Sequence, residues 1–428
     1  LVLSLTHAPS VEPMADPDIR GHVHRLTLQD ASMAQLLEKV CELHEAQLDR
    51  SGLLWHFYVI DGLADGSVAL YGKVHHGTID GRTFVKAVTQ WMSEDPKDKE
   101  VRAMWDGVAR SAKGAGQRAG IVQRLVAAGS QAVGLVRSAA GVYGLLAEQG
   151  LRSAGLGQGL PLPFLNVPGA FDGKLSARRS YAYCTLPLAE LKAVGKAHGA
   201  TVNDMLLTVL DIAMQRYLAK QKKVAREPLV ADMPVALAEG AKGGNQIAVL
   251  QFPLGQAAAS VSDRLSAIRA ETGRLKDALG KRDSDTVMLY TTLVHALPLL
   301  VERVAENAAP RLSNLLISNP FGFAGEPYLM GAKVELALPV SVVAAGHKLN
   351  VTAVTLGPRL QIGFLAMPAA VPHIDQLARL TEQAFDEVKA ALLPAAKAVL
   401  PKVATRKAPA KARGPVAAKR KAGAARAH

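Results

Sequence analysis

The sequence from Lys73 to Gly81 reads Lys-Val-His-His-Gly-Thr-Ile-Asp-Gly, and this stretch decides the predicted fold. Residues 67–75 and, before them, residues 55–61 have the pattern of β-strands joined by a turn. Residues 81–93 return apolar side chains at helical spacing. The two histidines are therefore predicted to stand where a strand ends, in a loop that leads into a helix.

The paired histidines are poor candidates for a metal site. Adjacent residues of a strand point to opposite faces, so His75 and His76 cannot easily bind one ion. No further ligands follow at the spacing that zinc sites use. We therefore expect no metal here.

Acid–base chemistry fits the motif better. A histidine takes and returns a proton near neutral pH, and a strand end can hold it at the edge of a cleft. Asp80 can bond to loop amides or to a basic side chain, and Gly77 and Gly81 permit tight backbone conformations. On these residues alone an alternative stays open, in which the motif is a solvent-facing turn and Asp80 caps the following helix.

Other catalytic motifs are missing from the sequence. It contains no Gly-x-Ser-x-Gly elbow, no cysteine in a recognisable nucleophile setting and no phosphate-binding loop of the Gly-x-x-x-x-Gly-Lys-Ser/Thr type. A conventional hydrolase and a P-loop nucleotidase are therefore both disfavoured.

Strand and helix patterns alternate along the whole chain, which predicts an α/β protein of two sheet-and-helix lobes. Further strands are predicted at residues 179–186, 229–235, 246–252, 312–318, 349–356 and 359–366. Further helices are predicted at residues 32–48, 188–198, 201–217, 261–279, 285–305 and 374–393. Residues 121–151 are apolar but interrupted by Arg124, Arg137 and Glu148, so we expect an amphipathic helix pair there and no membrane span.

The charge of the chain is concentrated at its end. The 428 residues carry a formal charge of +13, of which nine basic residues lie in residues 401–428, leaving about +4 on the rest. This tail lacks apolar periodicity and is predicted to be disordered. Two cysteines, Cys41 and Cys184, give no disulfide framework or zinc motif, which fits a cytoplasmic protein.

Several blocks of the sequence resemble the bacterial wax ester synthase/acyl-CoA:diacylglycerol acyltransferases. These belong to the superfamily of chloramphenicol acetyltransferase and the nonribosomal peptide condensation domains, which share the HHxxxDG motif. Leu48 to Trp55 resembles the family's Leu-Asp-Arg-Ser-x-Pro-Leu-Trp block, with Leu53 in place of the proline. Gly199 to Asp204 resembles its Asn-Asp block. Ser318-Asn319-Pro320 resembles its Ser-Asn-x-Pro block, one residue shorter, and residues 346–352 also fit. The resemblance spans about residues 12–393.

The resemblance implies a two-lobed, chloramphenicol acetyltransferase-like sandwich with an active-site tunnel between the lobes. The expected division is an N-terminal lobe at residues 1–105, a helical connector at 106–176, a C-terminal lobe at 177–394 and the tail at 395–428. Two features depart from the family pattern. A first segment with a Leu-Ser-x-x-Asp block does not precede the matched region, and Pro234 to Ala238 lacks the arginine of the family's Pro-Val-Ser-x-Arg block.

The resemblance also implies a mechanism without a covalent intermediate. His76 would be the general base that deprotonates a fatty alcohol or diacylglycerol, and the alkoxide would attack the thioester of acyl-CoA, a co-substrate, with no bound cofactor. Asp80 would order the loop, and His75 would bond on its opposite face. Asn203 and Asp204 would support the site, unless Asn203 or Thr201 merely caps its helix. Ser318 and Asn319 would shape the cleft.

The expected partners are lipids: the two substrates and a peripheral membrane or lipid-inclusion surface, with no specific nucleic acid. Two other functions stay open. One is a transferase of the same superfamily that takes its acyl or peptidyl group from a carrier protein. The other is a catalytically inactive protein that binds lipid granules through its basic tail. Acyl chain length, acceptor preference and oligomeric state are not encoded in recognisable motifs.

Overall fold

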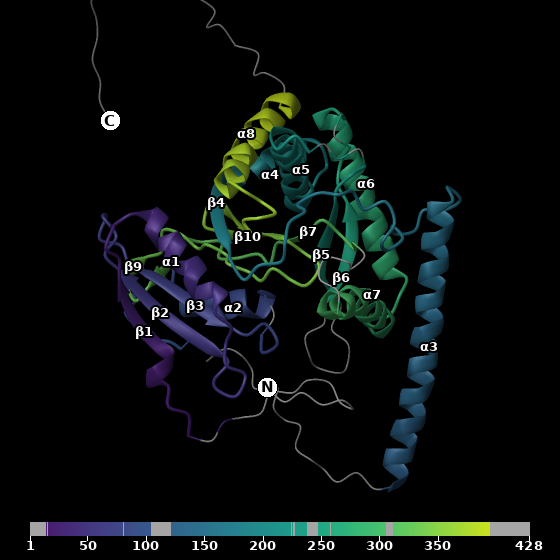
Figure 1. Ribbon diagram of the computed structural model, residues 1–428, viewed down its shortest axis with the longest axis horizontal. Helices are drawn as coiled ribbons and strands as arrows, with labels where there is room; N and C mark the ends of the chain where they lie inside the picture. The colour runs from purple at the N-terminus through teal and green to yellow at the C-terminus, as the bar shows by residue number, and fades with distance from the viewer. Residues whose placement is uncertain are drawn as a thin grey trace, which may run out of the picture. The chain divides into compact units, whose positions relative to one another are not determined.

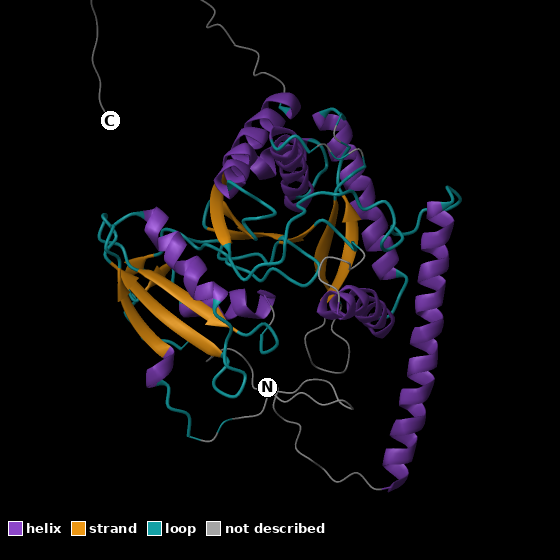
Figure 2. Cartoon of the chain, viewed as in Figure 1, coloured by secondary structure: helices purple, strands orange, loops and turns teal. Residues whose placement is uncertain are grey.

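Residues 14, 16–79, 81–103, 121–223, 225, 227–237, 247–256, 258–304 and 311–393 are described by the computed structural model. They contain a three-stranded sheet, a six-stranded sheet and one short hairpin, with helices packed around the two larger sheets (Figure 1). Helices and strands are mixed along the chain (Figure 2), which confirms the predicted α/β class.

The three-stranded sheet carries the histidine motif at the end of its last strand. Its strands are β1 (Val23–Thr27), β2 (Trp55–Asp61) and β3 (Ala69–Val74), after a 3-10 turn at Arg20–His22. β1 pairs with β2 in parallel and β2 with β3 antiparallel. Helix α1 (Met33–Glu45) covers one face, because its apolar side packs with Ile60 and Tyr71 into a small core. Helix α2 (Gly81–Trp91) follows β3.

The six-stranded sheet is mixed in direction. Its strands in spatial order are β4 (Ser180–Pro187), β11 (Arg359–Ala366), β10 (Leu349–Leu356), β7 (Leu315–Ser318), β5 (Val230–Ala236) and β6 (Ile247–Pro253). β7 runs parallel to both of its neighbours, and the other pairs are antiparallel. The small hairpin β8 (Tyr328–Leu329) and β9 (Ala332–Lys333) was not predicted from the sequence.

Five helices follow the strands of this sheet, and most of them form the layer that covers one face. Helix α5 (Val202–Lys220) is buried along most of its length and packs against α4 (Leu188–Ala197), α6 (Val261–Gly280) and α8 (Ile374–Leu392). Helix α7 (Ser284–Val304) packs on β6 and on α3 (Ile121–Ser153). Figure 1 shows α4, α5 and α8 on one side of the sheet and α7 on the other.

The two faces of the sheet differ in chemistry because successive side chains of a strand point to opposite sides. The face under α5 is apolar and includes Leu315, Ile317, Val351 and Phe364, all almost fully buried. Side chains that alternate with these along the strands point to the opposite face, and many of them are polar. We call this the polar face; its polar residues include Asp232, Gln251, Ser318, Asn350, Thr352 and Gln361.

An extended segment, residues 337–343, crosses the polar face and connects the two sheets; we call it the strap. Its backbone bonds to side chains of the sheet: the Ala337 amide to Gln361 Oε1 (2.5 Å), the Pro339 carbonyl to the Tyr181 hydroxyl (3.2 Å) and the Val342 carbonyl to Asn350 Nδ2 (2.7 Å). Val340 packs against the small core under α1 and also against the cluster of Cys41, Tyr181 and Leu365.

One predicted element is wrong, and three are shorter than predicted: α1, β3 and β7. Residues 121–153 form a single helix, where the sequence predicted a helix pair, because no proline interrupts them and the glycines within them are tolerated. β7 begins at Leu315 instead of residue 312, because the Asn314 side chain accepts the Val230 amide and takes over the pairing there. The predicted lobe boundaries remain a prediction, and the tail lies outside the described residues.

Candidate active site

The motif loop is held at both ends by regular structure. β3 pairs with β2 up to Val74, and the His75 amide continues this pairing to the Leu54 carbonyl at 2.9 Å. Next to it, Lys73 Nζ donates to the Leu43 carbonyl (2.7 Å) and to the Ala46 carbonyl at the end of α1. The strand end that carries the histidines is therefore fixed to both β2 and α1.

His75 braces the turn that follows it. Its Nδ1 accepts the Gly77 amide at 3.1 Å, and its carbonyl accepts the Thr78 amide (2.9 Å) and hydroxyl (2.6 Å). Partial burial, aided by the charges of Arg50 and His76, lowers the pKa of His75. The neutral form with a free Nδ1 lone pair is the one that can accept the Gly77 amide. The contact shows that the His75 ring is engaged with the turn, and its place relative to the reacting groups remains a prediction.

His76 is exposed at the first position of the turn. Among the described residues, none forms a hydrogen bond with its ring. Two surface cavities are lined by other parts of the chain, one by residues around Glu326 and Arg359 and the other by residues around Glu148 and Arg274. The predicted tunnel and the role of His76 as a base therefore remain predictions.

The motif also contains Asp80 and two glycines, Gly77 and Gly81, which differ in how closely their surroundings approach them. Asp80 lies outside the described residues. Gly77 has little room for a side chain, because a Cβ there would approach His75 Nδ1 to 3.1 Å. Gly81 begins α2, and a Cβ there would meet nothing within 4 Å. Of the two glycines, only Gly77 is crowded by its surroundings.

The Ser318–Asn319 block comes close to the motif through α2. The Arg82 guanidinium, one residue after Gly81, lies over the Phe321 ring at 5.8 Å from its centroid. Phe321 has a left-handed backbone with φ +69° and is 64% exposed, an unusual conformation for a bulky residue. The structure therefore brings the first turn of α2 next to the segment that follows Ser318 and Asn319.

A hydrogen-bond chain orients Ser318 on the polar face. Asn350 donates its amide to the strap and accepts the Thr352 hydroxyl at 2.8 Å, and the Thr352 oxygen lies 3.1 Å from Ser318 Oγ. A carbonyl can only accept, so the Val342 carbonyl identifies the donating atom of Asn350 as Nδ2 and leaves Oδ1 as the acceptor for the Thr352 hydroxyl. The Thr352 proton is then used, and Ser318 Oγ donates to Thr352 Oγ1. Nearby, Asn319 Oδ1 is buried with no partner among the described residues.

Asn203 and Asp204 lie in the first turn of α5. Thr201 is the N-cap of α5, and Asp204 completes a capping box by accepting the Thr201 amide (2.8 Å) and hydroxyl (2.7 Å). The second Asp204 oxygen accepts the Thr272 hydroxyl of α6 at 2.7 Å. Asp204 is 3% exposed and its contacts are those of a structural residue, as in the capping alternative, with Thr201 and not Asn203 as the cap.

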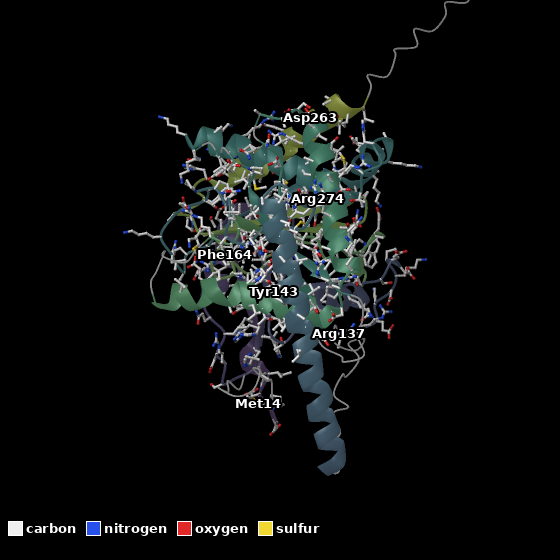
Figure 3. The ribbon with its side chains drawn as sticks, turned by 90° about the vertical axis from the view of Figure 1, so that its right-hand side faces the viewer. Met14, Arg137, Tyr143, Phe164, Asp263 and Arg274 are labelled. Atoms are coloured by element: carbon white, nitrogen blue, oxygen red, sulfur yellow. The ribbon has the colours of Figure 1, made fainter. Side chains whose placement is uncertain are left out.

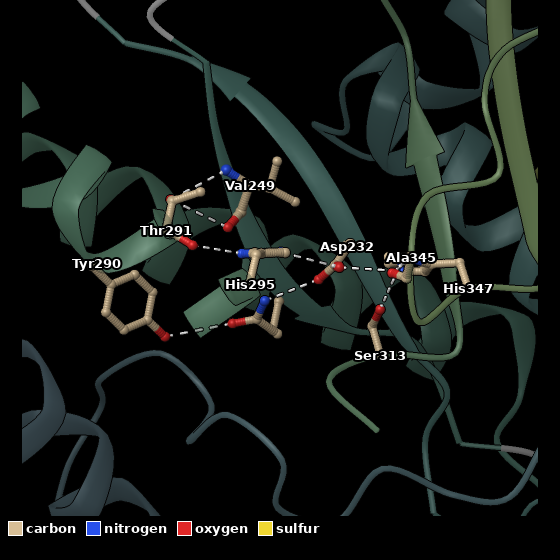
Figure 4. A network of polar contacts seen from close by, with 9 residues as sticks. Asp232, Val249, Tyr290, Thr291, His295, Ser313, Ala345 and His347 are labelled. Carbon is tan, nitrogen blue, oxygen red and sulfur yellow. Dashed lines mark hydrogen bonds and ion pairs between the residues drawn. The ribbon is translucent and has the colours of Figure 1, made fainter. Parts of the chain in front are cut away.

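A buried polar network on the polar face was missed by sequence reasoning (Figure 4). Asp232 Oδ2 lies 3.0 Å from His347 Nε2 and 3.3 Å from His295 Nε2. The other ring nitrogens face backbone carbonyls, those of Ala345 (3.1 Å) and Thr291 (2.8 Å). Each ring thus faces a hydrogen-bond acceptor at both of its nitrogens.

The pKa shifts of this network follow from its geometry. Burial alone would raise the pKa of Asp232, but its bonds to His295 and His347 hold that pKa well below its usual range. Burial alone would lower the pKa of His295, but its bond to Asp232 and the Asp232 charge raise it. A signal was available in the sequence, since Asp232 is a charged residue within an apolar strand and needs a buried partner.

Comparisons with known proteins agree with the blocks in the sequence. A family model described as the wax ester synthase/diacylglycerol acyltransferase catalytic domain matches residues 2–206, and the corresponding C-terminal domain matches residues 243–389. The chain is 34% identical over 395 residues to the probable diacylglycerol O-acyltransferase Tgs4 of Mycobacterium tuberculosis, covering 87% of this chain and 81% of that protein. It is 30% identical over 384 residues to the probable diacylglycerol O-acyltransferase tgs2 of the same organism, covering 88% and 83%.

Solved structures agree on the fold. The wax ester synthase/diacylglycerol acyltransferase of Marinobacter aquaeolei VT8 superposes with a TM-score of 0.62 at 22% identity, covering 88% of this chain and 81% of that one. The EpoB cyclization-docking bidomain of Sorangium cellulosum superposes with a TM-score of 0.50 at 13% identity, covering 88% and 70%. The chain therefore belongs to the wax ester synthase/diacylglycerol acyltransferase family and is an acyltransferase.

Proposed function

We propose that this acyltransferase moves a long-chain acyl group from acyl-CoA to a fatty alcohol or to diacylglycerol, with His76 as the general base. The observation that supports the proposal is that His76 is exposed on a turn held by β3 and by the contact of His75 with the Gly77 amide. The names of the relatives, which are described as diacylglycerol O-acyltransferases, support the substrate class.

The reaction requires one proton to move away from the acceptor and back to the leaving group. His76 takes the hydroxyl proton as the oxygen attacks the thioester carbonyl, because an aliphatic alcohol is far too weak an acid to ionise first. The carbonyl oxygen then carries negative charge, which hydrogen-bond donors must stabilise. When the C–S bond breaks, the CoA thiolate leaves and His76 returns the proton. Ser318, whose hydroxyl can rotate away from Thr352, is the donor that we assign to the oxyanion.

The test measures free CoA and ester from purified protein with palmitoyl-CoA and either hexadecanol or dipalmitoylglycerol. His76→Ala should lower kcat by ~10² or more, the usual contribution of general acid–base catalysis. The control is His373→Asn, which alters an exposed histidine at the start of α8 whose left-handed φ of 54° asparagine tolerates. Equal rates for wild type and His76→Ala would remove His76 from the mechanism.

The same assay separates the two other candidate functions. A carrier-dependent transferase would release no CoA from palmitoyl-CoA but would act on an acyl group loaded on a carrier protein. A catalytically inactive granule-binding protein would form ester with neither donor. Both outcomes would overturn the proposed reaction.

We also propose that the enzyme works in the cytoplasm at the surface of a membrane or lipid inclusion, because long-chain alcohols and diacylglycerols dissolve poorly in water. Among the described residues, no helix is long and apolar enough to cross a bilayer. Binding at such a surface would then depend on a face of the folded protein.

A further inference from the structure

Three histidines lie together on the three-stranded sheet, at its end near the motif. The rings of His22 and His56 stack with 4.5 Å between their centroids, and the ring centroids of His24 and His56 are 5.2 Å apart. Nε2 of His24 is 3.0 Å from Nδ1 of His56, which is a hydrogen bond from one ring to the other. All three residues are half-buried. We call them the imidazole cluster.

The imidazole cluster is connected to the motif through the start of β2. His22 Nδ1 donates to the Trp55 carbonyl at 2.8 Å, so the cluster is bonded to the first residue of that strand. In register Trp55 lies opposite Val74, the last residue of β3. The carbonyl of the residue before Trp55 accepts the His75 amide at 2.9 Å. The part of β2 that carries the cluster therefore also holds the strand end from which the motif turn leaves.

The bond between two imidazole rings exists only while at least one ring is neutral. An imidazolium has two donors and no lone pair, so it cannot accept a hydrogen bond. With both His24 and His56 protonated, this bond would be replaced by repulsion between two like charges in contact. A proton on His22, stacked against His56, would add a third charge. The packing of the cluster therefore requires that it stays largely unprotonated.

The groups around His56 add to this requirement. Lys73 lies opposite His56 in register, and its ammonium is held by two carbonyls at the end of α1. Burial, followed by the charges of the other two cluster rings and of Lys73, lowers the pKa of His56. On α1, His44 bonds to the Tyr71 hydroxyl at 3.0 Å, and burial lowers its pKa to about 4, so it brings no charge near neutral pH.

Two further titratable groups face the other cluster rings. The Tyr58 ring stacks on His24 with 4.7 Å between centroids, and burial raises its pKa, so it is uncharged. Asp18 is exposed at the outer edge, where its charge interacts with His22, and it forms an ion pair with Arg20 at 3.1 Å. The carboxylate therefore acts at His22, the ring farthest along the chain from β2, and the charges that act on His56 are positive.

We propose that the imidazole cluster positions the motif strand while its rings are neutral and releases that strand when mild acid protonates them. Its three histidines are positioning residues, because they act through β2 and not on the substrate. The lowered pKa of His56 gives stability that is present above the unfolded value of about 6.5 and is lost as pH falls through the folded pKa. The inference rests on the proposed function only where activity is measured.

The test compares the full-length wild type with the double variant His22→Asn/His24→Gln. Asparagine Nδ2 replaces Nδ1 of His22 and glutamine Nε2 replaces Nε2 of His24, so both hydrogen bonds are kept without a titrating ring. Between pH 7.5 and pH 5.5 the melting temperature of wild type should fall by about 3 °C or more beyond the fall of the variant. By NMR, His56 should titrate below about pH 6.5 in wild type and move towards that value in the variant.

Activity measures the connection to the motif. In the palmitoyl-CoA assay, the ratio of kcat at pH 7.5 to kcat at pH 5.5 should be roughly threefold or more smaller in the double variant, because titration of His76 affects both proteins alike. Two controls should keep the wild-type ratio. His373→Asn removes an exposed histidine at the start of α8. Asp263→Ala removes the carboxylate that accepts the Ser260 hydroxyl at the start of α6 (Figure 3), which lowers stability away from the cluster.

Three results would overturn the proposal. Equal falls in melting temperature would show that protons on the cluster do not oppose folding. A His56 signal that titrates above pH 6.5 in wild type would reverse the sign of the effect. Equal kcat ratios in wild type and the double variant would leave the cluster without an effect on the motif. If no protein forms ester, the proposed reaction fails, and hydrogen exchange of the His75 amide at pH 5.5, faster in wild type than in the variant, decides the release of the strand.

Discussion

Two neighbouring histidines have different surroundings at the motif. His75 uses Nδ1 to hold the Gly77 amide, while the ring of His76 remains exposed. The sequence alone offers two equivalent histidines, and the geometry separates them, because only one can face the turn when both leave the same strand end. In the proposed mechanism His75 holds the turn that carries His76, and the His76 ring stays available to the substrate.

The Asp232–His295 bond predicts a pH-dependent contribution to stability. The raised pKa of His295 gives stability that is present below the unfolded value of about 6.5 and is lost as pH rises through the folded pKa. The depressed pKa of Asp232 gives stability that is present above the unfolded value of about 3.8 and is lost as pH falls. Together they should stabilise most between about pH 4 and 6.5.

Urea unfolding of wild type and His295→Gln between pH 5 and 9 measures this contribution. Glutamine keeps a donor but cannot titrate, so the free-energy difference should be about 1–2 kcal/mol at pH 5.5, as for a hydrogen bond to a charged group, and should shrink towards pH 9. Stability curves that stay parallel across this range would show that His295 does not change its charge on folding.

At the scale of elements, the capping box of α5 predicts a loss of stability without a loss of chemistry. Asp204→Ala removes the cap and leaves the Thr272 hydroxyl without its acceptor, so the free energy of unfolding should fall by about 2 kcal/mol. Chemical denaturation checks this value, and kcat at 20 °C should stay within twofold of wild type. A large fall in kcat with unchanged stability would instead return Asp204 to the active site.

Elements with strong local patterns were predictable. The hairpin of residues 349–366 was placed correctly because its alternation and its Gly357–Pro358 turn are local, and Gly199, with φ +63°, ends α4 as expected. The sequence did not predict that α3 is one continuous helix. Its charged residues interrupt the apolar pattern, but a charged residue in a helix shows only that this position faces solvent and does not end the helix. Contacts such as Asp232 to His347 depend on the order of strands in the sheet, which no local pattern records.

The site itself was only partly predictable. The motif loop and Ser318 were found from sequence blocks, and the structure places Arg82 against Phe321 between them. Asn203 and Asp204 were proposed from a block that the fold uses to begin a helix. A polar pair in the first turn of an apolar helix suits both a capping role and a binding site, and only tertiary contacts separate the two.

At the scale of the molecule, the strap predicts how tightly the two sheets are coupled. Val340 packs against the small core under α1 and against the cluster of Cys41, Tyr181 and Leu365, so Val340→Asp places a charge in an apolar contact and should destabilise by about 3 kcal/mol. Calorimetry should then show two transitions where wild type shows one. Tyr181→Phe, which loses only the bond to Pro339, should cost about 1 kcal/mol and keep one transition. A single transition in both variants would mean that other contacts unite the sheets.

The pairing of β4 with β11 has a consequence for synthesis of the chain. Within the described sheet β11 is the only neighbour of β4, yet about 180 residues separate them in the sequence, from Ser180 to Ala366. During translation β4 is synthesised well before β11. The backbone groups of β4 that pair with β11 therefore stay unpaired until residues 359–366 have left the ribosome. Closure of this sheet is therefore a late event, and nascent chains released before Arg359 are natural substrates for chaperones and proteases.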